Sequence, residues 1–396
     1  MSNTPKLRFP EFNGEWEKKR LEEICDPPKY GLNSAGIEFD GIHKYLRITD
    51  IDEITHTFSP TDITTPSEFN DEYLLNKNDI VFARTGASTG KTYLYDSNDG
   101  DLYFAGFLIK FHVKDANARF VFYQTLTHKY SKWVHVMSTR SGQPGINSEE
   151  YGSYKIKLPD IHEQQKIADF LSNVDSIITA ETKILNTLQK KKKALMQKLF
   201  TRQLRFKSAD DTDFPTWEEK KLGEVCETYS GGTPKSGTAE YYGGEIPFIR
   251  SGEISSNKTE LFLTEKGMEN SSAKMVSKGD ILYALYGANS GLCSISKIDG
   301  AINQAILCIK TNENKRFLCN YLQYQREYFY STYLQGGQGN LSGKLVESFI
   351  IPLPCLVEQQ KIADCLSSMD SLIQTQQKVV TTWQQRKKAL LQQMFI

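Results

Sequence analysis

Two stretches of the chain carry apolar residues at alternating steps of three and four, which is the spacing of a coiled-coil seam. They run from residue 171 to 199 and from 366 to 394. The apolar positions expected to form a helical spacer are Leu171, Val174, Ile178, Leu185, Leu188 and Leu195 in the first stretch, and Leu366, Met369, Ile373, Val380, Trp383 and Leu390 in the second. Two separate amphipathic helices, each lying on its own domain, are the alternative.

Polar residues interrupt both seams at the same two steps. They are Glu181 and Lys192 in the first stretch, and Gln376 and Lys387 in the second. Polar residues in a seam can fix the register of a coiled coil at some loss of stability. The shared interruptions therefore favour a specific pairing of the two helices.

The two stretches belong to an internal repeat with an offset of 195 residues. Residues 158–200 and 353–395 are identical at 23 of 43 positions without a gap. Weaker matches outside these segments pair Trp16, Leu21, Cys25 and Gly86 with Trp217, Leu222, Cys226 and Gly287. The repeat predicts two divergent domains, at 1–157 and 204–352, and two helical spacer regions, at 158–203 and 353–396.

Each divergent domain has short runs of strand-forming residues separated by turn-rich loops. The clearest runs are residues 79–83, 107–113, 280–285 and 305–309. A helix is expected over residues 16–24, ended by a loop at the two prolines that follow. The predicted fold class is α+β, with two domains of small sheets separated by two long helices.

Connectivity predicts how the helices pair. About forty residues at 1.5 Å per residue make a rod of about 60 Å. If the second domain is compact with its ends close together, the second rod begins beside the end of the first and runs back along it. The two domains would then lie at opposite ends of an antiparallel coiled coil.

Length, charge and cysteine usage narrow the functional classes. The 396 residues suffice for at least two domains. The 48 basic and 48 acidic residues balance, so the global charge gives no hint of a nucleic-acid partner. The seven cysteines contain no C-x-x-C pair, which fits a reducing compartment and neither a zinc site nor a disulfide framework. With no signal-peptide core and no membrane-length apolar run, a cytoplasmic protein is expected.

Three catalytic motifs are nearly present. Residues 86–92 have three residues between glycines where a phosphate-binding loop has four. Residues 26–30 have a lysine inserted into the D-P-P-[YF] tetrapeptide of adenine methyltransferases. Residues 17–19 and 218–220 have the E-x-K form of metal-dependent nucleases, but such tripeptides are common on solvated helix faces. All six histidines lie in the first half, so equivalent work in both halves cannot need histidine.

Polar residues on the divergent loops are the candidates for DNA contact, because such side chains suit base edges and phosphates. The candidates in the first domain are Arg47, Arg84, Thr85, Ser88, Thr89, Lys91, Arg140, Ser141, Gln143 and Asn147. Those in the second domain are Thr233, Lys235, Arg250, Ser251, Tyr286, Asn289, Ser290, Gln338 and Asn340. A further candidate surface is the basic stretch 183–207, which has no acidic residue. A protein partner is favoured over DNA there, because the two helical segments are so alike.

The motifs EQQKIADFLS, EQQKIADCLS, GGTPKSG with YYGGEIPFIRSGEI, and GNLSGKLV complete the pattern. With this repeat layout, the chain closely resembles the specificity (S) subunits of type I restriction-modification systems over essentially its full length. The helical copies match that family well, whereas the first divergent domain has no GGTP equivalent.

The resemblance implies a specificity subunit that is not itself an enzyme and binds no cofactor. Each target-recognition domain would read one half of a split site in double-stranded DNA, and the helices would set the unread spacer. Two modification subunits, which bind S-adenosylmethionine and methylate adenine, would dock on the chain. Restriction subunits would add an ATP-dependent, Mg2+-requiring nuclease and translocase. An enzyme acting on nucleic acid alone and a coiled-coil adaptor without a DNA role are the competing classes.

Overall fold

The computed structural model describes residues 4–68, 70–139, 143–333 and 340–395. The chain divides into two compact units. The first unit comprises the chain up to Thr182 together with the stretch from Lys378 onward, and the second unit is Lys183–Gln377. Each unit therefore contains one divergent domain and one half of each long helix.

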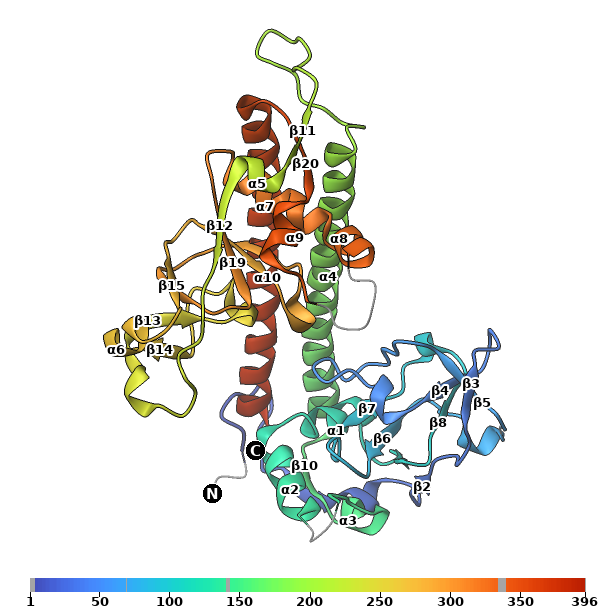
Figure 1. The fold of residues 1–396 in the computed structure, drawn as a ribbon. Coiled ribbons are helices and arrows are strands. Elements are labelled where there is room, and N and C mark those ends of the chain that lie inside the picture. Colours follow the sequence, from blue (N-terminus) through green and yellow to red (C-terminus); the bar gives the residue numbers. More distant parts are fainter. Residues whose placement is uncertain (1–3, 69, 140–142, 334–339, 396) are drawn as a thin grey trace. The chain divides into compact units, whose positions relative to one another are not determined.

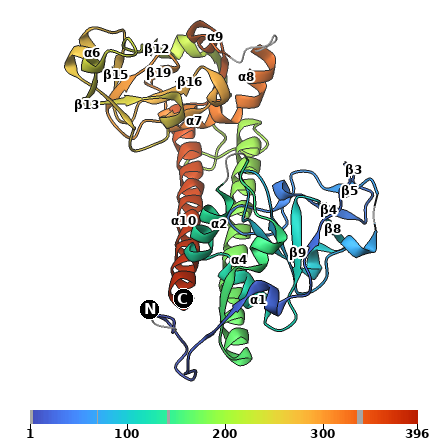
Figure 2. The same ribbon diagram turned by 90° about the horizontal axis from the view of Figure 1, so that it is seen from below.

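Two long helices account for the repeated segments. α4 spans Ile161–Phe200 and α10 spans Leu356–Met394, and Figures 1 and 2 both show them side by side. With 40 and 39 residues, each is a rod of about 60 Å. Glu181 and Gln376 are helical, so the polar seam positions do not break either helix.

In the first unit the two helices run antiparallel. Leu171 of α4 lies in one hydrophobic core with Leu391 of α10. One turn further along α4, Asp175 forms an ion pair with Lys387 of α10 at 2.6 Å. From the first contact to the second, the residue number rises along α4 and falls along α10, so the two helices are antiparallel.

The second unit repeats this arrangement. Lys192 of α4 pairs with Asp370 of α10 at 2.6 Å, and Leu199 shares a core with Leu366. All twelve predicted seam residues are buried or partly buried. The predicted antiparallel coiled coil is therefore confirmed. Each half-helix also packs on its own divergent domain, because the same cores contain residues of that domain.

The chain enters and leaves the first divergent domain through an antiparallel pair of strands, β1 (Glu17–Arg20) and β10 (Lys155–Leu158). The central sheet has the order β2-β9-β6-β7, with strands at Lys29–Tyr30, Leu108–His112, Asp79–Ala83 and Thr92–Leu94. β3 pairs with β5 and β4 with β8, at Gly36–Glu38, Thr64–Pro66, Lys44–Leu46 and Leu102–Phe104. α1, α2 and α3 span Ala118–Gln124, His128–Ser138 and Ser148–Gly152.

The second divergent domain is built on the same plan. β11 (Glu218–Lys221) pairs with β20 (Ile350–Leu353) where the chain enters and leaves. The sheet β12-β19-β16-β17 has strands at Cys226–Ser230, Ile306–Thr311, Ile281–Ala284 and Cys293–Ile295. The sheet β14-β13-β18-β15 has strands at Leu261–Leu263, Tyr242–Ile249, Gly300–Ile302 and Lys274–Val276. α5 to α9 span Leu222–Val225, Glu265–Glu269, Lys315–Tyr324, Arg326–Tyr333 and Gly343–Glu347.

The four predicted strand-like runs are confirmed as β6, β9, β16 and β19, but the helix predicted over residues 16–24 is wrong. Glu17–Arg20 forms β1, and Leu21–Ile24 is a single 3-10 turn. Backbone pairing with the distant strand β10 overrides the local preference of this charged segment. The E-x-K tripeptides therefore lie on largely exposed strands and not on helix faces.

Each entry segment is anchored to a long helix by an arginine. Arg8 donates to Glu163 of α4 at 2.8 and 2.7 Å, and Arg205 donates to Glu358 of α10 at 3.0 and 2.8 Å. The indole N–H of Trp217 also donates to Glu358 at 3.0 Å. The repeat thus extends to the start of each divergent domain, where the two sequences do not align.

No helix in the described part of the chain is both long and apolar enough to cross a membrane. The seven cysteines are free thiols.

Candidate nucleic-acid interface

Two predicted DNA-contact loops of the first unit lie against each other. Residues 84–91, called here the first glycine loop, connect β6 to β7, and residues 143–147 precede α3. The N–H of Ile146 donates to the carbonyl of Arg84 at 2.9 Å. The two loops therefore form one continuous surface although they are distant in the sequence.

The second unit has the same backbone arrangement. Residues 285–292, the second glycine loop, connect β16 to β17. The N–H of Leu341 donates to the carbonyl of Leu285 at 2.9 Å, which matches the bond between Ile146 and Arg84. The fold thus builds the same loop support twice, once in each unit.

Both glycine loops are connections between two strands of a sheet. A phosphate-binding loop instead joins a strand to a helix whose amides face the ligand. Each loop has two glycines with positive φ, where side chains are disfavoured. They are Gly86, Gly90, Gly287 and Gly291. The near-match to a phosphate-binding motif therefore reflects a tight turn.

A third loop reaches the same edge of the sheet in both units. Gly31 follows β2, and Gly231 follows β12. A Cβ on Gly231 would lie 1.8 Å from the carbonyl oxygen of Ile302, and a Cβ on Gly31 would lie 2.2 Å from that of Ala105. Only glycine permits such close backbone approach. The first domain therefore has a structural counterpart of the GGTP loop, which sequence comparison missed because only one glycine is shared.

Most described candidates of the first unit are accessible. Those at least partly exposed include Arg84, Thr85, Ser88, Thr89, Gln143 and Asn147. The hydroxyl of Thr89 donates to a carbonyl of its own loop at 2.7 Å, and Asn147 caps α3 by accepting from the N–H of Glu150 at 2.8 Å. Arg140 and Ser141 lie outside the described residues.

The second unit offers a different set of side chains. Those at least partly exposed include Thr233, Lys235, Ser251, Tyr286, Asn289 and Asn340. The hydroxyl of Thr233 donates to the side-chain oxygen of Gln304 at 2.6 Å, which ties the GGTP loop to the turn before β19. Gln338 lies outside the described residues.

Two candidates point into the fold. The side chain of Lys91 is 6% exposed, donates to the carbonyl of Ile51 at 3.0 Å and pairs with Glu53. Ser290 is fully buried, and its hydroxyl donates to the carbonyl of Leu285 at 3.1 Å. Both side chains hold their glycine loops in place, so neither is included in the interface proposed below.

The candidates Arg47 and Arg250 each form a bidentate clamp with a carboxylate of the same unit. Arg47 donates through Nε and Nη2 to Asp50 at 2.8 and 2.9 Å, and Arg250 donates through the same atoms to Glu253 at 3.1 and 3.0 Å. Arg250 also donates to Glu260 at 2.6 Å. These bonds to carboxylates raise the pKa of Arg250 above its ordinary value. Bidentate pairing orients a guanidinium but neutralises much of its charge.

The family of type I restriction modification DNA specificity domains matches the chain twice, over residues 13–190 and 215–382. The chain belongs to this family. The putative type I restriction enzyme MjaX specificity subunit of Methanocaldococcus jannaschii is 27% identical, over 98% of this chain and 95% of the relative. The MjaVIII specificity subunit of the same organism is 27% identical, over 97% and 92%.

Solved structures of type I systems share the fold. The crystal structure of the S subunit from M. genitalium has a TM-score of 0.61 and 18% identity, and covers 99% of both chains. A chain from a structural study of complex assembly and conformational transition of the type I R-M system has a TM-score of 0.55 and 18% identity. The match covers 95% of this chain and 96% of that chain. The chain is thus a non-catalytic specificity subunit with DNA-recognition domains, as expected.

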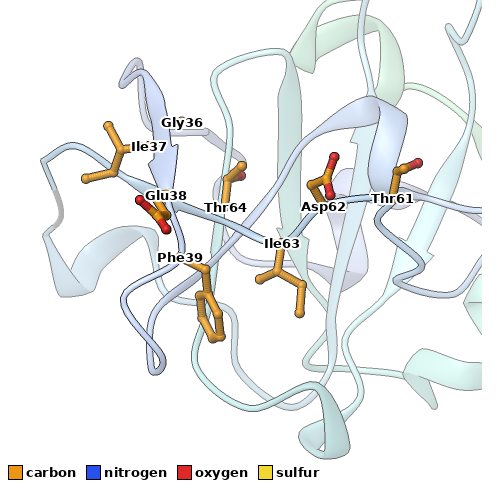
Figure 3. Close-up of a pocket in the computed structure, with 8 residues that line it drawn as sticks. All are labelled: Gly36, Ile37, Glu38, Phe39, Thr61, Asp62, Ile63 and Thr64. Carbon is orange, nitrogen blue, oxygen red and sulfur yellow. The ribbon is translucent and has the colours of Figure 1, made fainter.

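The first divergent domain also carries a shallow hollow beside β3 and β5 (Figure 3). Ile37, Phe39 and Ile63 supply apolar side chains to it, and Glu38 and Asp62 supply carboxylates. Carboxylates repel the phosphate backbone of DNA. The hollow is therefore left outside the nucleic-acid interface.

Proposed function

We propose that this specificity subunit reads a bipartite site in double-stranded DNA, with each unit reading one half. The observation that carries the proposal is the pair of glycine loops, which share their backbone hydrogen bonds but present different side chains. These are Arg84, Thr85, Ser88 and Thr89 in the first unit, and Tyr286 and Asn289 in the second. Direct readout of base edges needs a fixed support with variable donors and acceptors.

α4 and α10 are proposed to fix the unread gap between the half-sites. Both helices run through both units without a break, so their length and register would set the separation. Inserting four residues after Glu181 and four after Gln376 should lengthen the gap and leave both half-sites unchanged. An unchanged gap would contradict the spacer role.

The partners are proposed to be two modification subunits and the restriction subunits of a type I complex in the cytoplasm. S-adenosylmethionine, ATP and Mg2+ would bind to those partners. Exposed lysines on α4 are the proposed docking surface for modification subunits, namely Lys183, Lys190, Lys191, Lys193 and Lys198. Lys192 is excluded because it pairs with Asp370 inside the coiled coil.

Methylation mapping tests the proposal directly. The chain would be co-expressed with its modification subunit in a host that lacks adenine methylation, and methyladenine mapped across the genome. We expect a two-part motif with a fixed gap that disappears without this chain. A folded, co-purifying complex that gives no motif would favour a coiled-coil adaptor, whereas methylation, cleavage or ATP hydrolysis by the purified chain alone would favour an enzyme.

Exchanging the divergent domains provides a second test. A chain with residues 1–157 and 204–352 in each other's place should methylate a site with reordered half-sites. An adaptor without a DNA role should be indifferent to the exchange.

A further inference from the structure

We infer that Arg84 and Phe107 determine the sequence specificity of the first unit, and that Tyr30 is the positioning residue for Arg84. The inference rests on the proposed function and deepens it. It identifies which part of the common support makes the two half-sites different, and it adds two residues that sequence analysis did not select.

The three residues meet at one edge of the central sheet. Tyr30 is the last residue of β2, Phe107 immediately precedes β9, and Arg84 immediately follows β6. β9 lies between the other two strands in the sheet. The N–H of Arg84 donates to the carbonyl of Phe107 at 3.0 Å, and Tyr30 pairs with Ile109 of β9. The three side chains therefore arise from adjacent strand ends.

Tyr30 supports the guanidinium of Arg84. The guanidinium lies over the tyrosine ring, 5.1 Å from its centroid. The ring is itself fixed, because the hydroxyl of Tyr30 donates to the Ser148 hydroxyl at 3.1 Å and accepts from the Ser148 N–H at 3.2 Å. Within the described residues, the buried Nε of Arg84 has no hydrogen-bond partner. A stacked guanidinium keeps its terminal N–H groups available for the bidentate contact that arginine makes with guanine.

Phe107 is the exposed apolar group of the cluster. Phe107 is 59% exposed. The turn that carries it is held by the N–H of Gly106, which donates to the carbonyl of Leu32 at 2.8 Å. An apolar side chain beside a guanine-reading arginine can contact the methyl group of a thymine in the major groove.

The second unit has the same backbone at these positions but lacks all three side chains. The N–H of Leu285 donates to the carbonyl of Ala305 at 2.8 Å, in the same way as Arg84 to Phe107. Ser230, the last residue of β12, stands where the first unit has Tyr30. Leu285 is buried, so it replaces an arginine at the surface by a core residue.

This contrast favours DNA over a protein partner. A surface that docks copies of the same modification subunit should be alike in both units. These positions instead differ in charge, size and exposure. Surfaces that read two different half-sites must differ in this way.

The test compares methylation motifs of the intact complex for Arg84→Leu, Phe107→Ala and Tyr30→Ser with that of the wild type. The first two changes should relax discrimination at one base pair each, by about 5- to 150-fold, within the same half-site. Tyr30→Ser should relax the position read by Arg84, and Tyr30→Phe, which keeps the ring and loses only the hydroxyl, should relax it less. The other half-site and the gap should be unchanged, and Tyr286→Ala should affect that other half-site. Ile42→Ala, an equally exposed apolar residue before β4, is the control.

Several results would overturn the inference. One is a methylation motif that is unchanged in the Arg84 and Phe107 variants, although their complexes have the melting temperature of the wild type and still co-purify with the modification subunit. Another is loss of the modification subunit with an unchanged motif in the remaining complex, which would identify a docking surface. If a variant does not fold, Arg84→Lys and Phe107→Leu take its place, and their unchanged motifs would have the same meaning. A wild-type complex without any bipartite motif would instead refute the proposed function.

Discussion

Lys192 of α4 donates to the carboxylate of Asp370 on α10 at 2.6 Å, and the repeat places Lys387 against Asp175 at the same distance. Both lysines occupy seam positions where apolar residues are usual. Their side chains are 16% and 12% exposed. At these two of the four polar seam positions, the opposite helix, within the same unit, supplies a carboxylate at a defined register.

Breaking the Lys192 pair should destabilise the second unit. Asp370→Asn leaves a largely buried ammonium without its counter-charge, and we expect a loss of about 1 kcal/mol in the free energy of unfolding. Lys192→Gln should lose a similar amount, and the double variant should lose less than the sum. Urea unfolding measures the coupling. Lys193→Gln, at the exposed neighbouring position, is the control, and its loss of unfolding free energy should add to that of Asp370→Asn. If the losses of Lys192→Gln and Asp370→Asn also add, the pairing is contradicted.

Alanine at the close backbone contacts of Gly31 and Gly231 should disrupt the sheet edge that carries these loops. The Cβ of Gly231→Ala would lie 1.8 Å from the carbonyl oxygen of Ile302, so the two backbones must separate. We expect a loss of about 1 to 3 kcal/mol, read as a fall of several degrees in the melting temperature. Gly31→Ala should behave similarly in the first unit. Gly252→Ala, whose Cβ meets only an ordinary contact at 3.5 Å, is the control.

The sequence predicted the parts of the fold that depend on periodicity. Each seam is long enough for its spacing to identify a helix, and the shared interruptions at Lys192 and Lys387 indicated a specific pairing. The partners Asp175 and Asp370 could not be selected from sequence, because they lie beside the seam and not in it. Their choice depends on the register between two helices, which a single-chain pattern does not contain.

Local patterns failed where distant strands decide the outcome. Residues 16–24 have helical character, but β10 supplies the backbone partners of residues 17–20. Residue type also predicted DNA contact for Lys91, whose side chain turns inward to Ile51 and Glu53. Tyr30 and Phe107, which we propose as positioning and specificity residues, were not selected from the sequence because neither lies on a glycine-rich polar loop. Their proximity to Arg84 follows from the order of strands in the sheet.

Lys91→Met is expected to affect stability and not the electrostatics of DNA binding. The buried ammonium donates to the carbonyl of Ile51, and its loss leaves that acceptor unsatisfied, for about 1 to 3 kcal/mol. Loss of a lysine that contacts phosphate would instead reduce the slope of log affinity against log salt concentration by about one. Salt titration of DNA binding by the folded variant separates the two roles. A reduced slope with wild-type stability would restore Lys91 to the interface.

The clamp in the second unit predicts a pH-dependent contribution to stability. Burial of Glu253 would by itself raise the pKa of its carboxyl, but hydrogen bonds from Arg250, the Glu260 N–H and Thr259 prevail and lower that pKa to about 2 from an ordinary 4.5. Because the unfolded chain binds the proton first, the stabilisation is complete at neutral pH and is lost as pH falls from 4.5 towards 2. Glu253→Gln should therefore be less stable than the wild type at pH 7, with a difference that shrinks over that range. Urea unfolding at several pH values measures it, with exposed Glu245→Gln as the control; a difference that stays constant with pH would show that the lost stability comes from packing and not from the charge.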